Sequence, residues 1–319
     1  MAPPLTLNER AFRLADTMVQ SAQSLRINVQ QTPSGARIIN CGILTDGGLQ
    51  AGLTLARICL AGLAEVSLVP GDIGGFPCPQ VVVTTDQPVL ACMASQYAGW
   101  QIKVDPDFSA MGSGPMRAHY GKEPLFDTIP GRESAAMAVG VLETRKVPDD
   151  RVVTHLKEKL NLPAEKITLL VAPTASLAGN VQVVARSIET ALHRLHDLKF
   201  NLKQVVAGFG SAPLPPVSIG DVQAFGRTND AILYGGRVTL WVQSDDAQLQ
   251  EIGPKVPSCA SKDHGAPFAE IFTRYNSDFY KIDPALFSPA QVVFHNLKSG
   301  KTHGFGRLEP ELLLRSFFL

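Results

Sequence analysis

The chain has 319 residues, 45% of them hydrophobic and 18% charged, and its 29 basic and 29 acidic residues leave no net charge. This length predicts two lobes with a large core, and the balanced charge excludes the electrostatic footprint of a nucleic-acid or anionic-membrane binder. The five cysteines are odd in number and include no C-x-x-C pair, which argues against a disulfide framework or a zinc knuckle.

Two further features concern the location of the protein. No apolar stretch approaches the roughly 18 residues that a membrane span requires, and residues 1–9 lack the basic and apolar regions of a signal peptide. We therefore expect a soluble, cytoplasmic protein whose partner is a small molecule, and neither a nucleic acid nor a membrane.

The first element in chain order is a helix. Apolar residues recur at helical spacing from Leu7 to Leu25, behind a possible capping box formed by Thr6 and Glu9. A second helix is expected at 49–60 and a third at 87–98. Strand-like runs lie at 36–44, 64–69 and 80–85.

A long irregular loop is expected at 105–135, where Gly, Pro, Met and polar residues are frequent. The Val-Pro-Asp-Asp sequence at 147–150 then offers the best boundary between lobes. We accordingly predict an N-terminal lobe of residues 1–147 and a C-terminal lobe of residues 148–319.

The second half alternates between strand and helix patterns. A strand at 167–171 leads through a loop into a helix at about 180–198, and a second strand at 204–207 leads into a loop at 208–213. This order predicts an α/β fold, mixed with α+β features, in which the two strands form a parallel pair. Ligands tend to bind at the carboxyl ends of such strands.

The helix expected at 180–198 carries a polar stripe of Gln182, Arg186, Glu189, His193 and His196. Periodicity alone favours a solvated face, on which an i,i+3 ion pair contributes about 0.2–0.5 kcal/mol. The position of the Arg–Glu pair near the helix start, below a strand-end loop, favours a functional role. The H-x-x-H spacing lacks the glutamate of a zinc motif and a third ligand, so we expect no metal.

The glycine-rich segments match no cofactor motif. In Gly208-x-Gly210-x-x-Pro213 a proline replaces the third glycine of a dinucleotide fingerprint, and Gly112-Ser113-Gly114 lacks the spacing of a serine-hydrolase elbow. The polar segment 226–236 leaves two alternatives open. It is either a turn in which Asn229 and Asp230 bond their own backbone, or a polar clamp for a ligand.

Six strings resemble those of methenyltetrahydromethanopterin cyclohydrolases, in order and over about residues 8–318. They lie at 58–65, 94–102, 112–118, 171–182, 226–236 and 278–284. The resemblance implies reversible hydrolysis of the methenyl bridge of tetrahydromethanopterin to the 5-formyl derivative, without metal or cofactor. It also implies two α/β lobes with the pterin in the cleft between them, and assembly as a homotrimer.

The resemblance assigns the catalytic pair to Arg186 and Glu189. On the matching strings and in the loop at 208–213 we expect the substrate-binding residues, which are Gln96, Tyr97, Ser113, Gly114, Arg117, Ser176, Gln182, Ser211, Arg227, Thr228, Asn229 and Asp230. Two alternatives remain at this point, another pterin-dependent one-carbon enzyme such as a formyltransferase, and a non-catalytic pterin-binding protein.

Overall fold

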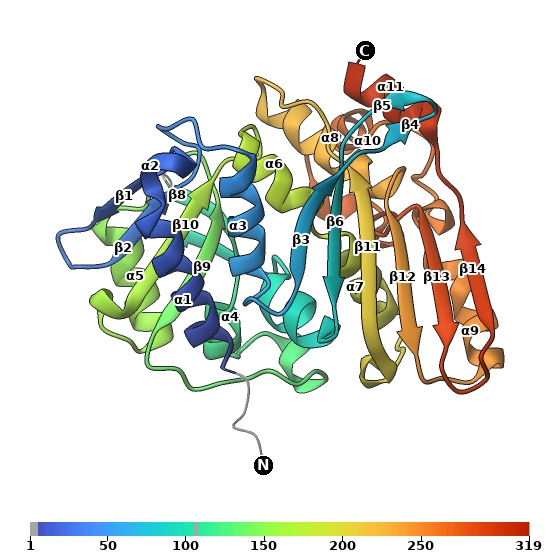
Figure 1. The fold of residues 1–319 in the computed structure, drawn as a ribbon, viewed down its shortest axis with the longest axis horizontal. Helices are drawn as coiled ribbons and strands as arrows, with labels where there is room; N and C mark the ends of the chain where they lie inside the picture. Colours follow the sequence, from blue (N-terminus) through green and yellow to red (C-terminus); the bar gives the residue numbers. More distant parts are fainter. Residues whose placement is uncertain (1–5, 105–107, 319) are drawn as a thin grey trace. The chain divides into compact units, whose positions relative to one another are not determined.

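The computed structural model describes residues 6–104 and 108–318. The chain divides into two compact units, each made of two segments. The first unit comprises the chain up to Ala64 together with Leu90–Gln182, and the second comprises Glu65–Val89 together with the chain from Val183 onward. Both units contain helices and a mixed sheet, so the predicted mixed α/β class is confirmed (Figure 1).

The sheet of the first unit has six strands. In spatial order they are β1 (Asn28–Gln31), β2 (Arg37–Asn40), β10 (Ile167–Ala172), β9 (Ala138–Glu143), β8 (Phe108–Ser113) and β7 (Trp100–Val104). Strands β2, β10 and β9 are mutually parallel, and the outer pairs are antiparallel. The predicted boundary between residues 147 and 148 therefore falls inside this unit, because β10 completes its sheet. Asp149 in that segment is the N-cap of the next helix.

Helices cover both faces of this sheet. Successive residues of a strand point to opposite faces, and on β10 Leu169 packs with α5 residues while Leu170 packs with residues of α1 and α3. The helices of the unit are α1 (Leu7–Gln20), α2 (Ala22–Leu25), α3 (Leu49–Cys59), the π-helix η1 (Val89–Gln96), α4 (Met116–Tyr120), α5 (Asp150–Leu160) and α6 (Leu177–Val184), with short 3-10 turns η2 (Pro124–Asp127) and η3 (Ala164–Lys166).

Two local predictions for this unit need correction. The segment 105–135 is not one long loop, because β8 and α4 form within it, while residues 105–107 lie outside the described residues. Phe108 and Ala110 on β8 belong to the core, which outweighs the loop-like composition. The hydroxyl of Thr6 donates to Glu9 at 2.9 Å, yet it makes no capping bond to the backbone of α1.

The second unit also has a six-stranded sheet. In spatial order its strands are β14 (Thr302–Gly306), β13 (Gln291–Asn296), β12 (Arg237–Val242), β11 (Val205–Pro213), β6 (Gln80–Thr85) and β3 (Glu65–Val69), beside a small hairpin of β4 (Asp72–Ile73) and β5 (Phe76–Pro77). Its helices are α7 (Ser187–Asp197), α8 (Asp221–Leu233), α9 (Asp246–Ile252), α10 (Phe268–Arg274) and α11 (Pro310–Phe318), with 3-10 turns η4 (Leu202–Gln204), η5 (Gly253–Lys255), η6 (Ser258–Ala260), η7 (Phe279–Lys281) and η8 (Pro284–Leu286).

The predicted parallel pairing of the two strands around 167–171 and 204–207 is wrong. They correspond to β10 and β11, which belong to different sheets, and β11 is antiparallel to both of its neighbours, β6 and β12. The segment 208–213, predicted as a loop, is the second half of β11. Its backbone pairs with β6 through Pro213, so Ser211 lies within a strand rather than at the end of one.

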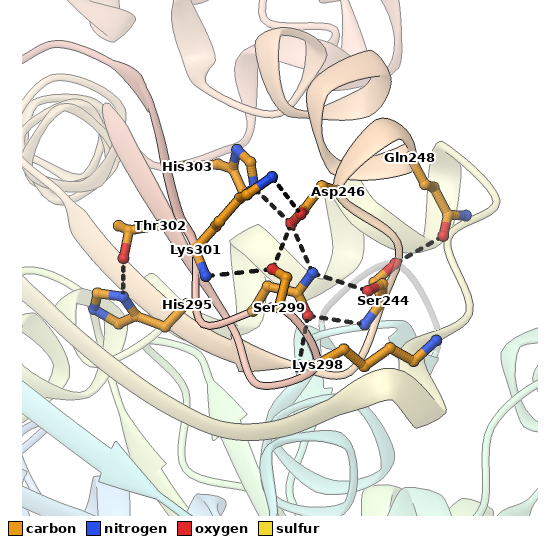
Figure 2. Close-up of polar contacts among 10 residues, drawn as sticks. Ser244, Asp246, Gln248, His295, Lys298, Ser299, Lys301, Thr302 and His303 are labelled. Atoms are coloured by element: carbon orange, nitrogen blue, oxygen red, sulfur yellow. Dashed lines mark hydrogen bonds and ion pairs between the residues drawn. The ribbon is translucent and has the colours of Figure 1, made fainter.

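A carboxylate joins α9 to the hairpin of β13 and β14 (Figure 2). Asp246, the first residue of α9, accepts hydrogen bonds from Asn296 at 2.8 Å and Ser299 at 2.8 Å, and lies 2.9 Å from Nε2 of His303. The ammonium of Lys301 is 3.4 Å away. The hydrogen bond with His303, followed by those from Asn296 and Ser299, holds the pKa of Asp246 below its usual value.

We predict that Asp246 makes the stability of the protein depend on pH. A lowered pKa means that its contribution is present above the unfolded-state pKa of about 4 and is lost as the pH falls further. Asp246→Asn should therefore lower the melting temperature at pH 7 and flatten its decline in acid. Thermal unfolding between about pH 7 and pH 3 measures both effects.

The neighbouring Asp245→Asn is the matched control, because that carboxylate is exposed and forms an ion pair of 3.5 Å with the exposed Lys298. It should change the melting temperature much less at neutral pH. Equal effects of the two substitutions would contradict the role given to Asp246.

Candidate active site

The candidate catalytic pair lies where one helix ends and another begins. The sequence predicted a single helix at 180–198, but α6 ends at Val184 and α7 begins at Ser187. Arg186 occupies the N-cap position of α7, with φ −94° and ψ 9°, and Glu189 lies in its first turn. A carboxylate in the first turn of a helix is stabilised by the helix dipole and by backbone N–H groups that lack helical partners.

The structure brings Arg186 and Glu189 together in a buried position. Nη1 of Arg186 lies 3.9 Å from Oε2 of Glu189, which is an ion pair rather than a direct hydrogen bond. The two residues are only 8% and 5% exposed. Removing one member of a buried ion pair leaves the charge of the other without this partner, so a substitution at either residue should also affect the other.

The first turn of α7 rests on β11 at a glycine. A Cβ added to Gly210 would lie 2.4 Å from Oγ of Ser187 and 2.8 Å from Cγ1 of Ile188. Ser187 is fully buried, and its hydroxyl has no hydrogen-bond partner among the described residues. The lack of a side chain at Gly210 therefore sets how closely the turn carrying Glu189 approaches the sheet.

Three of the predicted binding residues meet around a thiol in the first unit. The Sγ atom of Cys59, at the end of α3, lies 3.4 Å from Oγ of Ser113 and accepts a bond from Nε2 of Gln182 at 3.6 Å. It also lies 4.0 Å from the carbonyl oxygen of Gln96. The amide of Gly114 donates to the carbonyl of Ser95 at 2.9 Å, beside this group.

Two other predicted residues of this unit support the same region. Arg117 is fully buried and binds Glu123 through two hydrogen bonds of 2.9 and 2.7 Å, while its third nitrogen donates to the carbonyl of Met93 at 3.0 Å. Its guanidinium also lies over the ring of Tyr97, 4.9 Å from the centroid. With all three nitrogens engaged, Arg117 holds the ring of Tyr97 in place, and direct contact of either residue with a ligand stays a prediction.

Ser176 lies at the start of α6. Its hydroxyl accepts a bond from the amide of Gly179 at 3.1 Å and donates to the carbonyl of Pro173 at 2.7 Å. Such a bond satisfies a backbone N–H of the first helical turn. Ser176 thereby fixes the beginning of the helix that carries Gln182.

The segment 226–236 is mostly helix α8 and not a turn. Thr228 and Asn229 bond backwards to the carbonyl oxygens of Ala224 and Phe225 within the helix. The turn offered for this segment is therefore wrong, because the backbone is helical from Gly226 to Leu233. A ligand-binding role for these two side chains stays a prediction.

Arg227 and Asp230 tie α8 to the other helices of the second unit. Nε of Arg227 donates to the carbonyl of Ser316 on α11 at 3.1 Å. Asp230 accepts bonds from the hydroxyl of Ser316 at 2.6 Å and from the amide of Phe268, which begins α10, at 2.8 Å. Burial raises the pKa of Asp230 to about 7. These contacts hold α8 against α10 and α11. Whether Arg227 or Asp230 also contacts a ligand stays a prediction.

No group of three or more His, Cys, Asp or Glu side chains gathers as a metal site within residues 6–104 and 108–318. His193 instead lies 3.9 Å from Asp197 on the same helix. In the same described ranges, no helix combines the length and the apolar character needed to cross a membrane.

A family model and several relatives of known name match this chain over nearly its whole length. The family model described as Cyclohydrolase (MCH) matches residues 6–317. The chain belongs to this cyclohydrolase family. It is 46% identical over 316 residues to the methenyltetrahydromethanopterin cyclohydrolase of Methylobacterium organophilum, covering 98% of this chain and 97% of that protein.

Two other relatives resemble this chain to a similar degree. The protein of the same name from Rhodopirellula baltica is 46% identical over 318 residues, covering 98% of this chain and 95% of the relative. The one from Methanosarcina barkeri is 41% identical over 317 residues, covering 98% of each chain. The recognition made from the six strings is therefore confirmed.

Sequence reasoning missed Cys59 and Gly210 in this cyclohydrolase. Cys59 lies in one of the six strings, but among the apolar residues of α3 a cysteine is typical of a buried core position. Gly210 lies in a segment that partly matches a dinucleotide motif. A glycine on a strand can also indicate close approach of a neighbouring element, and that signal was present.

We predict that Gly210→Ala destabilises the protein by about 1–3 kcal/mol, the usual cost of overpacking. The added methyl group would push Ser187 and Ile188 and shift the first turn of α7. Gly208→Ala is the matched control, since its Cβ would lie 3.2 Å from the side chain of Ile188 and 3.5 Å from that of Leu240, with no atom closer. Denaturant unfolding of both variants measures the difference, and equal stability would refute the close approach at Gly210.

Proposed function

We propose that this chain reversibly hydrolyses 5,10-methenyltetrahydromethanopterin to the 5-formyl derivative in one-carbon metabolism. The observation that carries the proposal is the buried Arg186–Glu189 pair at the start of α7. It occurs in a chain that is 46% identical, over nearly its whole length, to a relative named for this activity.

The chemistry of the substrate explains why such a pair suffices. A methenyl bridge between two nitrogens is an amidinium-like cation, so its carbon is already electrophilic. We infer that the reaction needs no metal and no cofactor, since the pterin derivative is itself the substrate. What the reaction lacks at neutral pH is a deprotonated water molecule, and a positioned general base supplies it.

Glu189 is the proposed base. It takes a proton from water while the water oxygen bonds to the methenyl carbon, and it returns that proton to N10 as the C–N10 bond breaks. The hydroxyl proton of the adduct is released when the formyl carbonyl forms, so one proton is produced overall. General acid–base catalysis of this kind contributes about 10²–10⁴-fold.

Arg186 is proposed to keep Glu189 ionised and oriented. An opposite charge 3.9 Å away favours the carboxylate form. The pairing also offsets the repulsion that an isolated guanidinium would exert on a cationic substrate. We also propose that the polar group of Gln96, Ser113 and Gln182 binds the pterin. The ligand cleft and the homotrimer implied by the family resemblance, together with a cytoplasmic location, are further parts of the proposed function.

The decisive test is incubation with the methenyl substrate while its near-ultraviolet absorbance is followed. Disappearance that requires only water supports the proposal. A requirement for a formyl acceptor would indicate a formyltransferase, and binding without turnover would indicate a pterin-binding protein.

We predict that Glu189→Gln slows hydrolysis at least about 100-fold while the substrate still binds. The amide is nearly isosteric with the carboxylate but cannot accept the proton. Steady-state rates and a binding titration measure the two properties. Some loss of affinity is expected, because a negative charge near the cation has been removed.

His193→Gln is the control for this experiment, because His193 follows on the same stripe of α7 and is paired with Asp197. It should retain most of the activity. Normal turnover by Glu189→Gln would show that Glu189 is not the base.

A further inference from the structure

The Cys59 thiol lies where three segments of the first unit converge. Ser113 of β8 and Gln182 of α6 contact the thiol, and from the π-helix η1 the carbonyl oxygen of Gln96 lies 4.0 Å from it. The hydroxyl of Ser95, also in η1, donates to the backbone carbonyl oxygen of Cys59 at 2.7 Å. Cys59 itself is fully buried. Its side chain is therefore held in place on several sides and can hold its neighbours in turn.

Close packing of α3 on α6 brings the thiol to Gln182. A Cβ added to Gly52 of α3 would lie 2.8 Å from Cβ of Val181 and 3.0 Å from the backbone oxygen of Ala178. Cys59 follows Gly52 by seven residues, which places both on one face of the helix. The approach allowed at Gly52 thus directs the thiol toward the last turn of α6.

We propose that Cys59 is a positioning residue that fixes the orientation of the Gln182 side-chain amide for substrate binding. This inference rests on the proposed function. A thiol can donate or accept a hydrogen bond. Because the thiol of Cys59 donates to the carbonyl oxygen of Gln96 at 4.0 Å, its sulfur is left as the acceptor for the amide nitrogen of Gln182 at 3.6 Å, and this selects which end of the amide faces Cys59. The amide oxygen then serves as the acceptor for a ligand.

The chemistry of a pterin matches that acceptor. The pterin ring carries an exocyclic amine and a ring N–H, both of which are hydrogen-bond donors. An amide held with its oxygen toward these donors binds without first losing rotational freedom, and this preorganisation strengthens binding. Without the thiol, the amide of Gln182 can turn its nitrogen toward the ligand, where two donors would face each other.

The test compares Cys59→Ala with Cys59→Ser. If Cys59 served only to fill the core, the KM of Cys59→Ser should be no lower than that of Cys59→Ala, because a buried hydroxyl is costly to desolvate. If Cys59 orients Gln182, serine keeps an acceptor and should partly restore binding. We expect Cys59→Ala to raise KM for the methenyl substrate roughly 2- to 10-fold, the worth of one net hydrogen bond, with kcat nearly unchanged and a smaller rise in KM for Cys59→Ser.

Cys41→Ala is the matched control. Cys41 is also fully buried in the first unit, and its thiol contacts the carbonyl oxygen of Ile39 at 3.8 Å. Its substitution should lower the melting temperature as Cys59→Ala does, without changing KM. In a double-mutant cycle, Cys59→Ala should add little to the KM of Gln182→Leu, because both changes remove the same oriented amide.

The outcomes separate the two proposals. If the wild-type protein does not hydrolyse the methenyl substrate, the proposed function fails. If it does and Cys59→Ala has an unchanged KM, or the effects of Cys59→Ala and Gln182→Leu on KM are additive, the role of Cys59 is refuted and the proposed function stands. Should Cys59→Ala not fold, the same cycle is run with Cys59→Val, which also removes the acceptor, and the same criterion decides.

Discussion

The close approach of the first turn of α7 to β11 is the constraint on which the candidate site depends. Gly210 has no side chain, and Ser187 and Ile188 occupy the space that a Cβ would need. The turn that rests there carries Arg186 at its N-cap and Glu189 three residues later. Their buried ion pair therefore depends on a backbone-to-helix distance, and mutations that preserve both charges can still disturb it.

Strongly periodic segments were predictable from the sequence. The strand at Gln80–Thr85 was predicted with its observed bounds, and the helix beginning at Leu49 was predicted to within one residue of its end. Both are dominated by local pattern, a run of β-branched residues in one and helical apolar spacing in the other. The prediction that Arg186 and Glu189 form the catalytic pair rested on the family strings, since periodicity alone favoured a solvated face.

Features that depend on distant contacts could not be predicted in this way. No glycine or proline marks the break before Ser187, and the pairing of β11 with β6 joins strands from separate parts of the chain. Asp230 lies on one of the family strings, but its hydrogen bonds to Phe268 and Ser316 join three helices in a way that the sequence does not show. Sequence identifies which residues are polar, whereas tertiary packing decides whether their partners are ligands or helices.

The assignment of Glu65–Val89 to the second unit has a consequence for synthesis on the ribosome. Strand β6 is made early, but its neighbour β11 begins only at Val205. At about 5–20 residues per second, the roughly 120 intervening residues take on the order of 6–24 s to emerge. During that interval one edge of β6 can pair with β3, but the edge that later meets β11 has no partner strand, and such unpaired edges favour aggregation. Nascent chains of this protein are consequently most vulnerable after the first unit has folded and before β11 is complete.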